Sequence, residues 1–460
     1  MAQSAIDRGD RAFLGHPRGL GYLAFSEGGT AFSYYGMQSL LVLYMANELL
    51  KPGPVDRILG FGAFHGFLEH LYGPLSLTAT ATAITGLFSG IVYAMPILGG
   101  LVADRWLGRT RTLVTGAVLM TAGHFLMSFY ATFLIALAAI LIGSGFFNAN
   151  LRAQVGELYA AGDTRRADAF QVYTLAVNIA VIVAPLICGT LGEKGGYHYG
   201  FVAAGIGMAL GLVIYLAGRR WMPPEPPRRA KAVRSADAPV LTGHERRTIL
   251  LLALLVLPLA LTFVGNQEIF NAYLLWGEAH YQLLFFGQVM PVSWLLSLDA
   301  FVSVTCIFGS VMFWRWYARH RRDPDEIVKI VIGSAIVACA PLVLAAASVV
   351  AGPQGKVGLG WGLGFHIVND IGFANLYPIG LALYSRAAPP QLSATMISVF
   401  MLSIFLGTSL AGRLGGLLDT MPGPSFWAMH SAIIGVAVVV LLIVWRFAGH
   451  MLSPRSEAER

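Results

Sequence analysis

Gly99-Gly100-Leu101-Val102-Ala103-Asp104-Arg105-Trp106-Leu107-Gly108-Arg109-Thr110-Arg111 is a polar segment between two long apolar runs. Its glycines would let neighbouring helices approach closely, and its arginines are typical of the cytoplasmic side of a membrane. Asp104, Arg105 and Arg109 could latch one part of the chain to another in one state and release it in the next. An ordinary basic loop would contain similar residues, but the combination favours a gating loop at the cytoplasmic end of two spanning helices.

The composition around this segment is that of a membrane protein. Of 460 residues, 56% are hydrophobic and only 12% are charged, whereas a soluble domain averages about 45–50% and about 25%. The 53 glycines and 22 prolines are also tolerated in membrane helices, where neighbouring segments satisfy freed backbone groups. A lipid bilayer is therefore the expected surrounding.

The sequence carries no pattern typical of an enzyme. Cys188, Cys306 and Cys339 lie in apolar runs without ligand-like spacing, which predicts neither a disulfide framework nor a metal site. We find no nucleophile–base pair and no nucleotide-binding loop, and we expect no cofactor other than a proton as coupling ion. The formal net charge of +7 follows from membrane topology and requires no nucleic-acid partner.

Apolar runs long enough to span a bilayer recur along the chain. We expect an all-α integral membrane protein with about twelve transmembrane helices, since each span needs about 20 residues. The predicted helices lie near 22–50, 83–104, 111–132, 134–160, 168–190, 199–219, 249–276, 296–318, 327–350, 358–385, 391–418 and 426–448. The length of segment 51–82 predicts a short interfacial helix on the outer face.

The basic residues predict the orientation of these helices. Most lysines and arginines fall in segments that are cytoplasmic if both termini are inside, and the outside segments hold only Lys51, Arg57, Lys194 and Lys356. Because short cytoplasmic loops retain basic residues, we expect a multi-pass protein of the cytoplasmic (inner) membrane with both termini in the cytoplasm. A polar, proline-rich linker then divides the chain into a tail, two six-helix bundles and a second tail: 1–19, 20–218, linker 219–248, 249–449 and 450–460.

Two six-helix bundles joined by a linker resemble the major facilitator superfamily, whose halves rock about a midplane site. Several motifs are similar to those of its proton-coupled oligopeptide transporter family, and they occur in the same order over nearly the whole chain. They are the loop quoted above, Phe32-Ser33-Tyr34-Tyr35-Gly36-Met37, Asn178 with Ala184-Pro185-Leu186-Ile187-Cys188-Gly189, Pro291-Val292-Ser293-Trp294-Leu295-Leu296-Ser297-Leu298, and Pro378-Ile379-Gly380-Leu381. The chain is therefore identified as a diverged member of this family, which implies the major facilitator fold and secondary transport.

The charged residues that the family uses to bind dipeptides are mostly missing. Thr30 and Ala31 stand where the family's helix 1 motif has glutamate and arginine, Asn148 replaces the helix 4 lysine, and Phe373 replaces the helix 10 acidic residue. In the family, the basic groups face the peptide carboxylate and the glutamate faces the amino end. Because a buried unpaired charge is costly, this chain should bind ordinary di- and tripeptides poorly.

A few ionisable groups nevertheless remain inside the membrane, where each costs about 2.5–3.5 kcal/mol on insertion scales. Glu27, Glu268 and Asp370 could bind a proton in dry surroundings and release it in wet ones, because desolvation disfavours the charged form. Each could instead be a structural partner. Arg152 lies one turn beyond the missing lysine and could face an anionic group of the solute, or it could form an interior salt bridge with Glu27 or Glu157.

Uncharged polar side chains could bind a solute without net charge, although some will only tie helices together. The candidate substrate-binding residues are Tyr34, Tyr35, Asn148, Arg152, Asn178, Gln267, Asn271, Asn375 and Tyr377. His124 and His366 are intramembrane histidines that could titrate near neutral pH, although a lone histidine more often packs.

These features predict a secondary active transporter of a small peptide-like or amphiphilic solute. We expect alternating access and proton coupling with charge machinery that differs from the peptide-transporter pattern. A uniporter and a proton-driven drug exporter are alternatives, and a membrane sensor or accessory protein without transport is an alternative from another class. A monomer is the simplest expected state.

Overall fold

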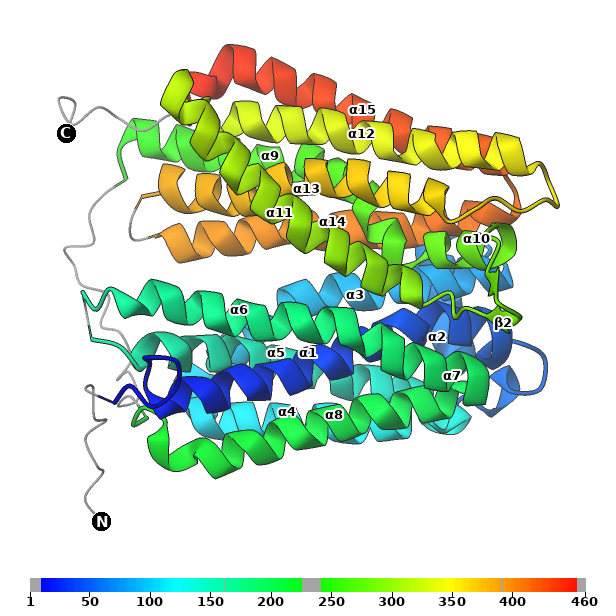
Figure 1. Ribbon diagram of the computed structural model, residues 1–460, viewed down its shortest axis with the longest axis horizontal. Coiled ribbons are helices and arrows are strands. Elements are labelled where there is room, and N and C mark those ends of the chain that lie inside the picture. The colour runs from blue at the N-terminus through cyan, green and yellow to red at the C-terminus, as the bar shows by residue number, and fades with distance from the viewer. Residues whose placement is uncertain (1–9, 161, 226–240, 390–391, 453–460) are drawn as a thin grey trace. The chain divides into compact units, whose positions relative to one another are not determined.

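The computed structural model describes residues 10–160, 162–225, 241–389 and 392–452. Within them, twelve α-helices have 18 or more residues (Figure 1). They are α1 (Arg18–Tyr44), α3 (Leu77–Val102), α4 (Arg109–Leu126), α5 (Phe133–Glu157), α6 (Arg165–Ala184), α8 (Tyr197–Gly218), α9 (Gly243–Gln267), α11 (Trp294–His320), α12 (Glu326–Ala351), α13 (Gly360–Ala387), α14 (Ser393–Gly415) and α15 (Gly423–Ala448).

Shorter elements connect these helices. A helical turn Pro185–Gly189 continues α6 into α7, and a two-stranded antiparallel hairpin precedes α11. Segment 51–82 contains a short helix as predicted, although its position on the outer face stays a prediction. The bounds are α2 (Phe61–Tyr72), α7 (Thr190–Gly195), α10 (Ala272–His280), β1 (Leu284–Phe285) and β2 (Gln288–Val289).

The helices have the character of membrane spans. Nine helical stretches of the described residues are long and apolar enough to cross a bilayer. Large apolar side chains on them point outward, such as Phe308, which is 68% exposed, and Leu257, which is 65% exposed. α1, α4 and α13 are not among the nine, because they carry more polar residues, many of which are buried. The expected all-helical membrane fold is thus confirmed.

Contacts between elements divide the described chain into two units. Unit 1 contains the described residues of Met1–Phe67 and Ala94–Arg234, and unit 2 contains those of Leu68–Tyr93 and Ser235–Arg460. The first part of α3, as far as Tyr93, therefore belongs to unit 2. The division of the chain at 218 and 249 stays a prediction.

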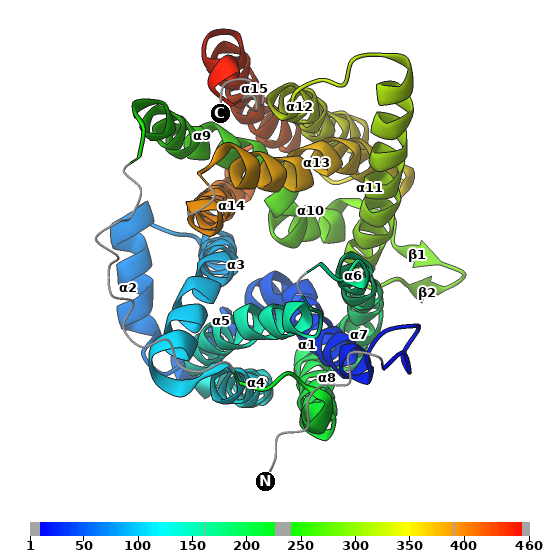
Figure 2. The same cartoon turned by 90° about the vertical axis from the view of Figure 1, so that its left-hand side faces the viewer.

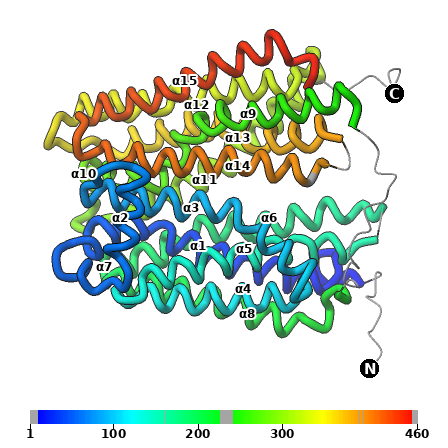
Figure 3. The backbone as a smooth tube through the Cα atoms, turned by 180° about the vertical axis from the view of Figure 1, so that it is seen from behind, coloured from blue at the N-terminus to red at the C-terminus, as the bar shows by residue number. Residues whose placement is uncertain are grey.

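Unit 1 is built around α1, which packs against α6 and α8, while α4 packs against α5 and α8 (Figure 2). Its core includes Leu20, Met120, Phe147 and Leu151. In unit 2, α12 packs against α13 and α15, and α9 packs against α14 (Figure 3). Each unit therefore buries its own apolar core and holds its own polar groups in place.

The glycine-rich loop that opened the sequence analysis joins α3 to α4. A helical turn Ala103–Leu107 extends α3, and Gly108 then adopts a φ of +81°, which favours glycine. A Cβ atom at Gly99 would collide with the carbonyl of Gly145 on α5. Gly99 thus serves close helix packing within unit 1, as the sequence context suggested, whereas Gly100 has open space around it.

One predicted helix is interrupted. The sequence predicts a continuous helix near 249–276, but α9 ends at Gln267 and a tight turn Glu268–Phe270 follows. Asn271 has φ −137° and ψ −116°, far from helical values, and α10 begins after it. The prediction of one continuous helix is wrong here, and Glu268 lies at the break.

Candidate functional site

Unit 1 brings together Glu27 on α1, Arg152 on α5 and Tyr173 on α6. The Glu27 side chain is buried, with 4% exposure, and interacts electrostatically with the Arg152 guanidinium and the Tyr173 hydroxyl. Neither Glu27 Oε2 nor the Tyr173 hydroxyl forms a hydrogen bond of normal geometry with another described residue. Arg152 is largely exposed. The arrangement can therefore hold a carboxylate beside a cation that other groups can reach.

The other substrate-binding candidates of unit 1 lie on the same three helices. Tyr34 and Tyr35 on α1, Asn148 on α5 and Asn178 on α6 are all partly buried. Because Asn148 precedes Arg152 by one helical turn, the two residues share a face of α5. Their role in binding stays a prediction.

The gating candidates lie at the loop between α3 and α4. Asp104 and Arg105 are exposed, whereas Arg109 forms an ion pair with Glu157 at the end of α5. Glu225 accepts a hydrogen bond from the Thr110 N–H at 3.4 Å. Arg109 thus ties α4 to α5 within unit 1, and the proposed gating role of these residues stays a prediction.

Unit 1 has a groove of about 680 Å³ along α1, α6 and α8. Apolar side chains line it, including Phe32, Ile179 and Ile206. The side chain of Ile179 is 54% exposed and that of Ile206 is 50% exposed. None of the charged candidates lines this groove. We therefore interpret it as a lipid-facing surface and not as the solute site.

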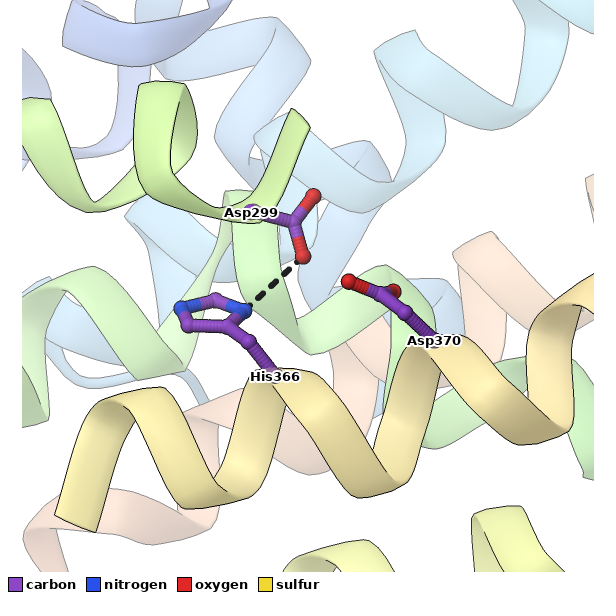
Figure 4. A group of neighbouring side chains, drawn as sticks. All are labelled: Asp299, His366 and Asp370. Carbon is purple, nitrogen blue, oxygen red and sulfur yellow. Dashed lines mark hydrogen bonds and ion pairs between the residues drawn. The ribbon is translucent and has the colours of Figure 1, made fainter. Parts of the chain in front are cut away.

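Unit 2 holds a second polar cluster, formed by Asp299 on α11 with His366 and Asp370 on α13 (Figure 4). One ligand atom of each residue lies within 4.8 Å of the others. His366 Nδ1 and Asp299 Oδ1 are 2.8 Å apart, and the side chains of His366 and Asp299 are 0% and 13% exposed. Of the described residues, these three could hold a metal ion.

A further layer of polar groups fixes this cluster. His366 Nε2 is 2.9 Å from the Tyr273 hydroxyl, which accepts a hydrogen bond from the Tyr281 hydroxyl at 3.3 Å. Asn369 Nδ2 donates to Asp370 Oδ1 at 3.1 Å. Asp370 Oδ2 is buried and has no hydrogen-bond partner among the described residues.

Glu268 is held by a different set of partners. Its Oε1 accepts from His430 Nε2 at 3.0 Å, and both side chains are fully buried. Its Oε2 accepts from the Ala272 N–H at 3.2 Å, at the start of α10. Glu268 thus satisfies a free amide where the helix is broken, so the geometry describes a structural role, while its proton-coupling role stays a prediction.

The amide candidates of unit 2 mainly connect helices. Asn375 Oδ1 accepts from Ser310 and from Trp314 Nε1 on α11, at 3.1 and 2.6 Å. Gln267 Oε1 accepts from the Thr408 hydroxyl of α14, and Asn271 Nδ2 donates to a backbone carbonyl of α3. These bonds leave fewer groups for a solute than the sequence suggested.

Aromatic rings surround Phe373, the residue expected at the family's helix 10 acidic position. Phe373 stacks on Tyr377 with ring centroids 5.7 Å apart, and it meets Phe263 edge-on at 6.2 Å. Phe373 and Tyr377 are only partly buried. The surface here is apolar with one phenolic hydroxyl.

Sequence reasoning missed Asp299, His430 and Tyr273. Asp299 directly follows the Pro291–Leu298 motif and is an acidic residue within a predicted span, so the rule that selected Glu27 would have selected it too. His430 is also ionisable and intramembrane. Tyr273 carries no comparable signal, because its role depends on its distance from His366.

Comparisons with known proteins place the chain among transporters. A family model described as Major Facilitator Superfamily matches residues 23–412. The Uncharacterized transporter YclF of Bacillus subtilis is 27% identical, with 94% of this chain and 93% of that protein covered. Peptide transporter YePEPT of Yersinia enterocolitica subsp. palearctica is 26% identical, with 96% and 97% covered.

Solved structures show the same architecture. A mutant form of the peptide transporter POT in complex with alafosfalin has a TM-score of 0.81 and 25% identity, covering 98% of this chain and 100% of that one. A POT family transporter in complex with 5-aminolevulinic acid has a TM-score of 0.79 and 24% identity, covering 96% and 98%. These likenesses confirm the expected fold and the resemblance stated from the motifs.

Proposed function

This chain belongs to the Major Facilitator Superfamily and is a multi-pass membrane transporter, and we propose that it moves a small peptide-like or amphiphilic solute by alternating access. The proposed driving force is a proton gradient. The names of the curated relatives support peptide-like solutes, and the altered charges of this chain support a departure from plain di- and tripeptides.

The pairing of Glu27 with Arg152 supports proton coupling more directly than any other observation. A proton on Glu27 removes the negative charge beside Arg152, so the guanidinium can bind an anionic group of the solute instead. Loss of the proton restores the competing carboxylate and favours solute release. Proton and anionic solute would therefore bind with positive cooperativity, as linkage requires.

The expected solute carries an anionic group. Arg152 is the exposed cation of the Glu27 group, and guanidinium groups bind carboxylates in a planar, two-bonded geometry. In unit 2 taken by itself, Phe373 stacks on Tyr377 and presents aromatic surface without a carboxylate, so this surface provides no counter-charge for a free amino group.

The distribution of lysine and arginine supports a place in the cytoplasmic membrane with both termini inside. The segments rich in lysine and arginine include 105–111, 165–166 and 315–322, whereas Lys356 is the one basic residue of the loop 352–359. The direction of the proton gradient, and not this membrane topology, then decides whether the solute is imported or exported.

The test compares two transport modes in proteoliposomes, with a solute first identified by a thermal-shift screen of peptides, peptide-like natural products and amphiphilic drugs. Gradient-driven accumulation depends on proton coupling, whereas solute exchange at equal pH does not. A gradient of two pH units supplies about 2.7 kcal/mol per proton, and thus an about hundredfold concentration ratio. We expect Glu27→Gln to keep exchange and to lose accumulation.

Glu48→Gln is the matched control, because Glu48 is a partly buried carboxylate just after α1 that bonds the Tyr130 hydroxyl. It should accumulate solute like the wild type. Wild-type uptake that ignores the gradient would show a uniporter, and accumulation that persists in Glu27→Gln would remove Glu27 from the coupling mechanism.

A further inference from the structure

The cluster of Asp299, His366 and Asp370 has the composition and spacing of a cation site. His366 and Asp370 are four residues apart on α13 and so project from one face of the helix. Asp299 reaches them from α11, and the three ligand atoms lie within 4.8 Å of one another (Figure 4). Tetrahedral zinc places its ligands about 3.4 Å apart, given metal–ligand distances of about 2.0–2.1 Å. Small side-chain movements would close the cluster to that size.

No described lysine or arginine balances the charge of the cluster. Two carboxylates lie together in apolar surroundings, and the hydrogen bonds and ion pairs described for them include no lysine or arginine. Two carboxylates at this distance strongly disfavour being charged together unless a cation or a proton lies between them. Asp370 is 1% exposed, and its carboxylate is directed into the cluster (Figure 4). Its Oδ2 has no hydrogen-bond partner within the part of the chain that the structure describes.

The surrounding groups match those that orient metal ligands. A ligating histidine usually bonds a protein group through its second nitrogen, and here His366 Nε2 meets the Tyr273 hydroxyl at 2.9 Å. If Nδ1 binds a metal, Nε2 carries the proton and donates to that hydroxyl, which can act as donor or acceptor. Asn369 likewise holds Asp370 Oδ1, so both ligands on α13 are already fixed.

We propose that Asp299, His366 and Asp370 bind one divalent transition-metal cation of the Zn²⁺ or Mn²⁺ type. One imidazole nitrogen with two carboxylates suits these ions better than Mg²⁺, which prefers oxygen ligands and water. The three protein ligands leave a coordination position for water or for a donor atom of the solute. The ion would join α11 to α13 and neutralise the paired carboxylates.

The experiment uses the full chain in detergent, purified without a histidine tag and stripped with a chelator. Zn²⁺, Mn²⁺ or Mg²⁺ is added, the protein is desalted, and bound metal per chain is measured by mass spectrometry together with the melting temperature. We expect about one Zn²⁺ or Mn²⁺ per chain and no retained Mg²⁺. Asp299→Asn, Asp370→Asn and His366→Gln should each weaken binding at least about tenfold.

His430→Gln is the control, because it removes the other buried histidine–carboxylate pair of unit 2 but no proposed ligand. It should bind metal like the wild type. Absence of retained metal, or retention that the three ligand variants leave unchanged, would overturn the proposal. The visible absorption spectrum of the wild type with bound Co²⁺ is a second measurement that needs no variant. A site of low coordination number with nitrogen and oxygen ligands should give strong visible bands. The absence of these bands would also count against the site. Because retained metal is measured without transport, this result is independent of the proton-coupling test.

Discussion

Glu27 and Glu268 are both carboxylates within apolar helices, yet their surroundings give them different chemistry. Glu268 accepts from His430 and from the Ala272 N–H, so both of its oxygens are fixed. Glu27 lies beside Arg152 and Tyr173 and keeps one oxygen without a hydrogen bond among the described residues. The sequence suggested the same role for both, because the partners come from distant helices. Only the structure distinguishes a carboxylate with both oxygens bonded at a helix break from one that keeps an oxygen without a hydrogen bond among the described residues.

The role of Glu268 predicts a difference between two of its variants. Glu268→Ala leaves the buried His430 Nε2 and the Ala272 N–H unpaired, and breaking such a buried pair costs about 3–5 kcal/mol. Glu268→Gln keeps a side-chain acceptor, so its melting temperature in detergent should fall much less. Glu278→Ala, an exposed carboxylate on α10, is the control and should melt like the wild type. A Glu268→Gln variant of normal stability that loses gradient-driven accumulation would instead assign Glu268 to proton coupling.

Between helices, glycines decide how closely the backbones approach. Within unit 2, the first part of α3 crosses α14 at Gly86 and Gly412. A Cβ atom at Gly412 would lie 2.8 Å from Gly86 Cα and 2.8 Å from the Thr82 carbonyl oxygen, and one at Gly86 would also collide with backbone. Sequence composition indicated close packing in general terms, but it could not show that this part of α3 pairs with α14, because the two segments are more than 300 residues apart.

The crossing predicts opposite effects for one substitution at two sites. Gly86→Ala forces a methyl group against the α14 backbone, and overpacking of this kind costs about 1–3 kcal/mol. Gly435→Ala on α15 meets nothing within 4 Å, so it should be neutral or should stabilise by about 0.5–1 kcal/mol through helix propensity. Thermal unfolding of both variants in the same detergent measures the difference. Equal melting temperatures would show that α3 and α14 can separate at this crossing without cost.

For the chain as a whole, the apolar runs were enough to predict the helices, because each span is apolar on its own. The positions of most helices follow the prediction, and the exception is the break at Asn271, whose backbone angles no periodicity announces. The candidate site was harder to predict. Asp299 and His366 are 67 residues apart in sequence and 2.8 Å apart in space, so their pairing depends on how α11 meets α13. Tertiary contacts of this kind leave no local pattern in a single sequence.

The substrate range proposed for this chain rests on charges that the chain lacks. A dipeptide is a zwitterion, and its buried ends need fixed opposite charges. Thr30 and Ala31 are buried and uncharged, Asn148 is neutral, and Phe373 packs against Phe263 and Tyr377.

We therefore expect dialanine uptake into proteoliposomes to stay near background even with an imposed proton gradient, while a reconstituted di-/tripeptide transporter gives robust uptake in parallel. Asn148→Lys restores one missing charge, one turn from Arg152, and should raise dialanine binding if the missing charges are the cause. Saturable dialanine uptake by the wild type would contradict the inference drawn from the missing charges.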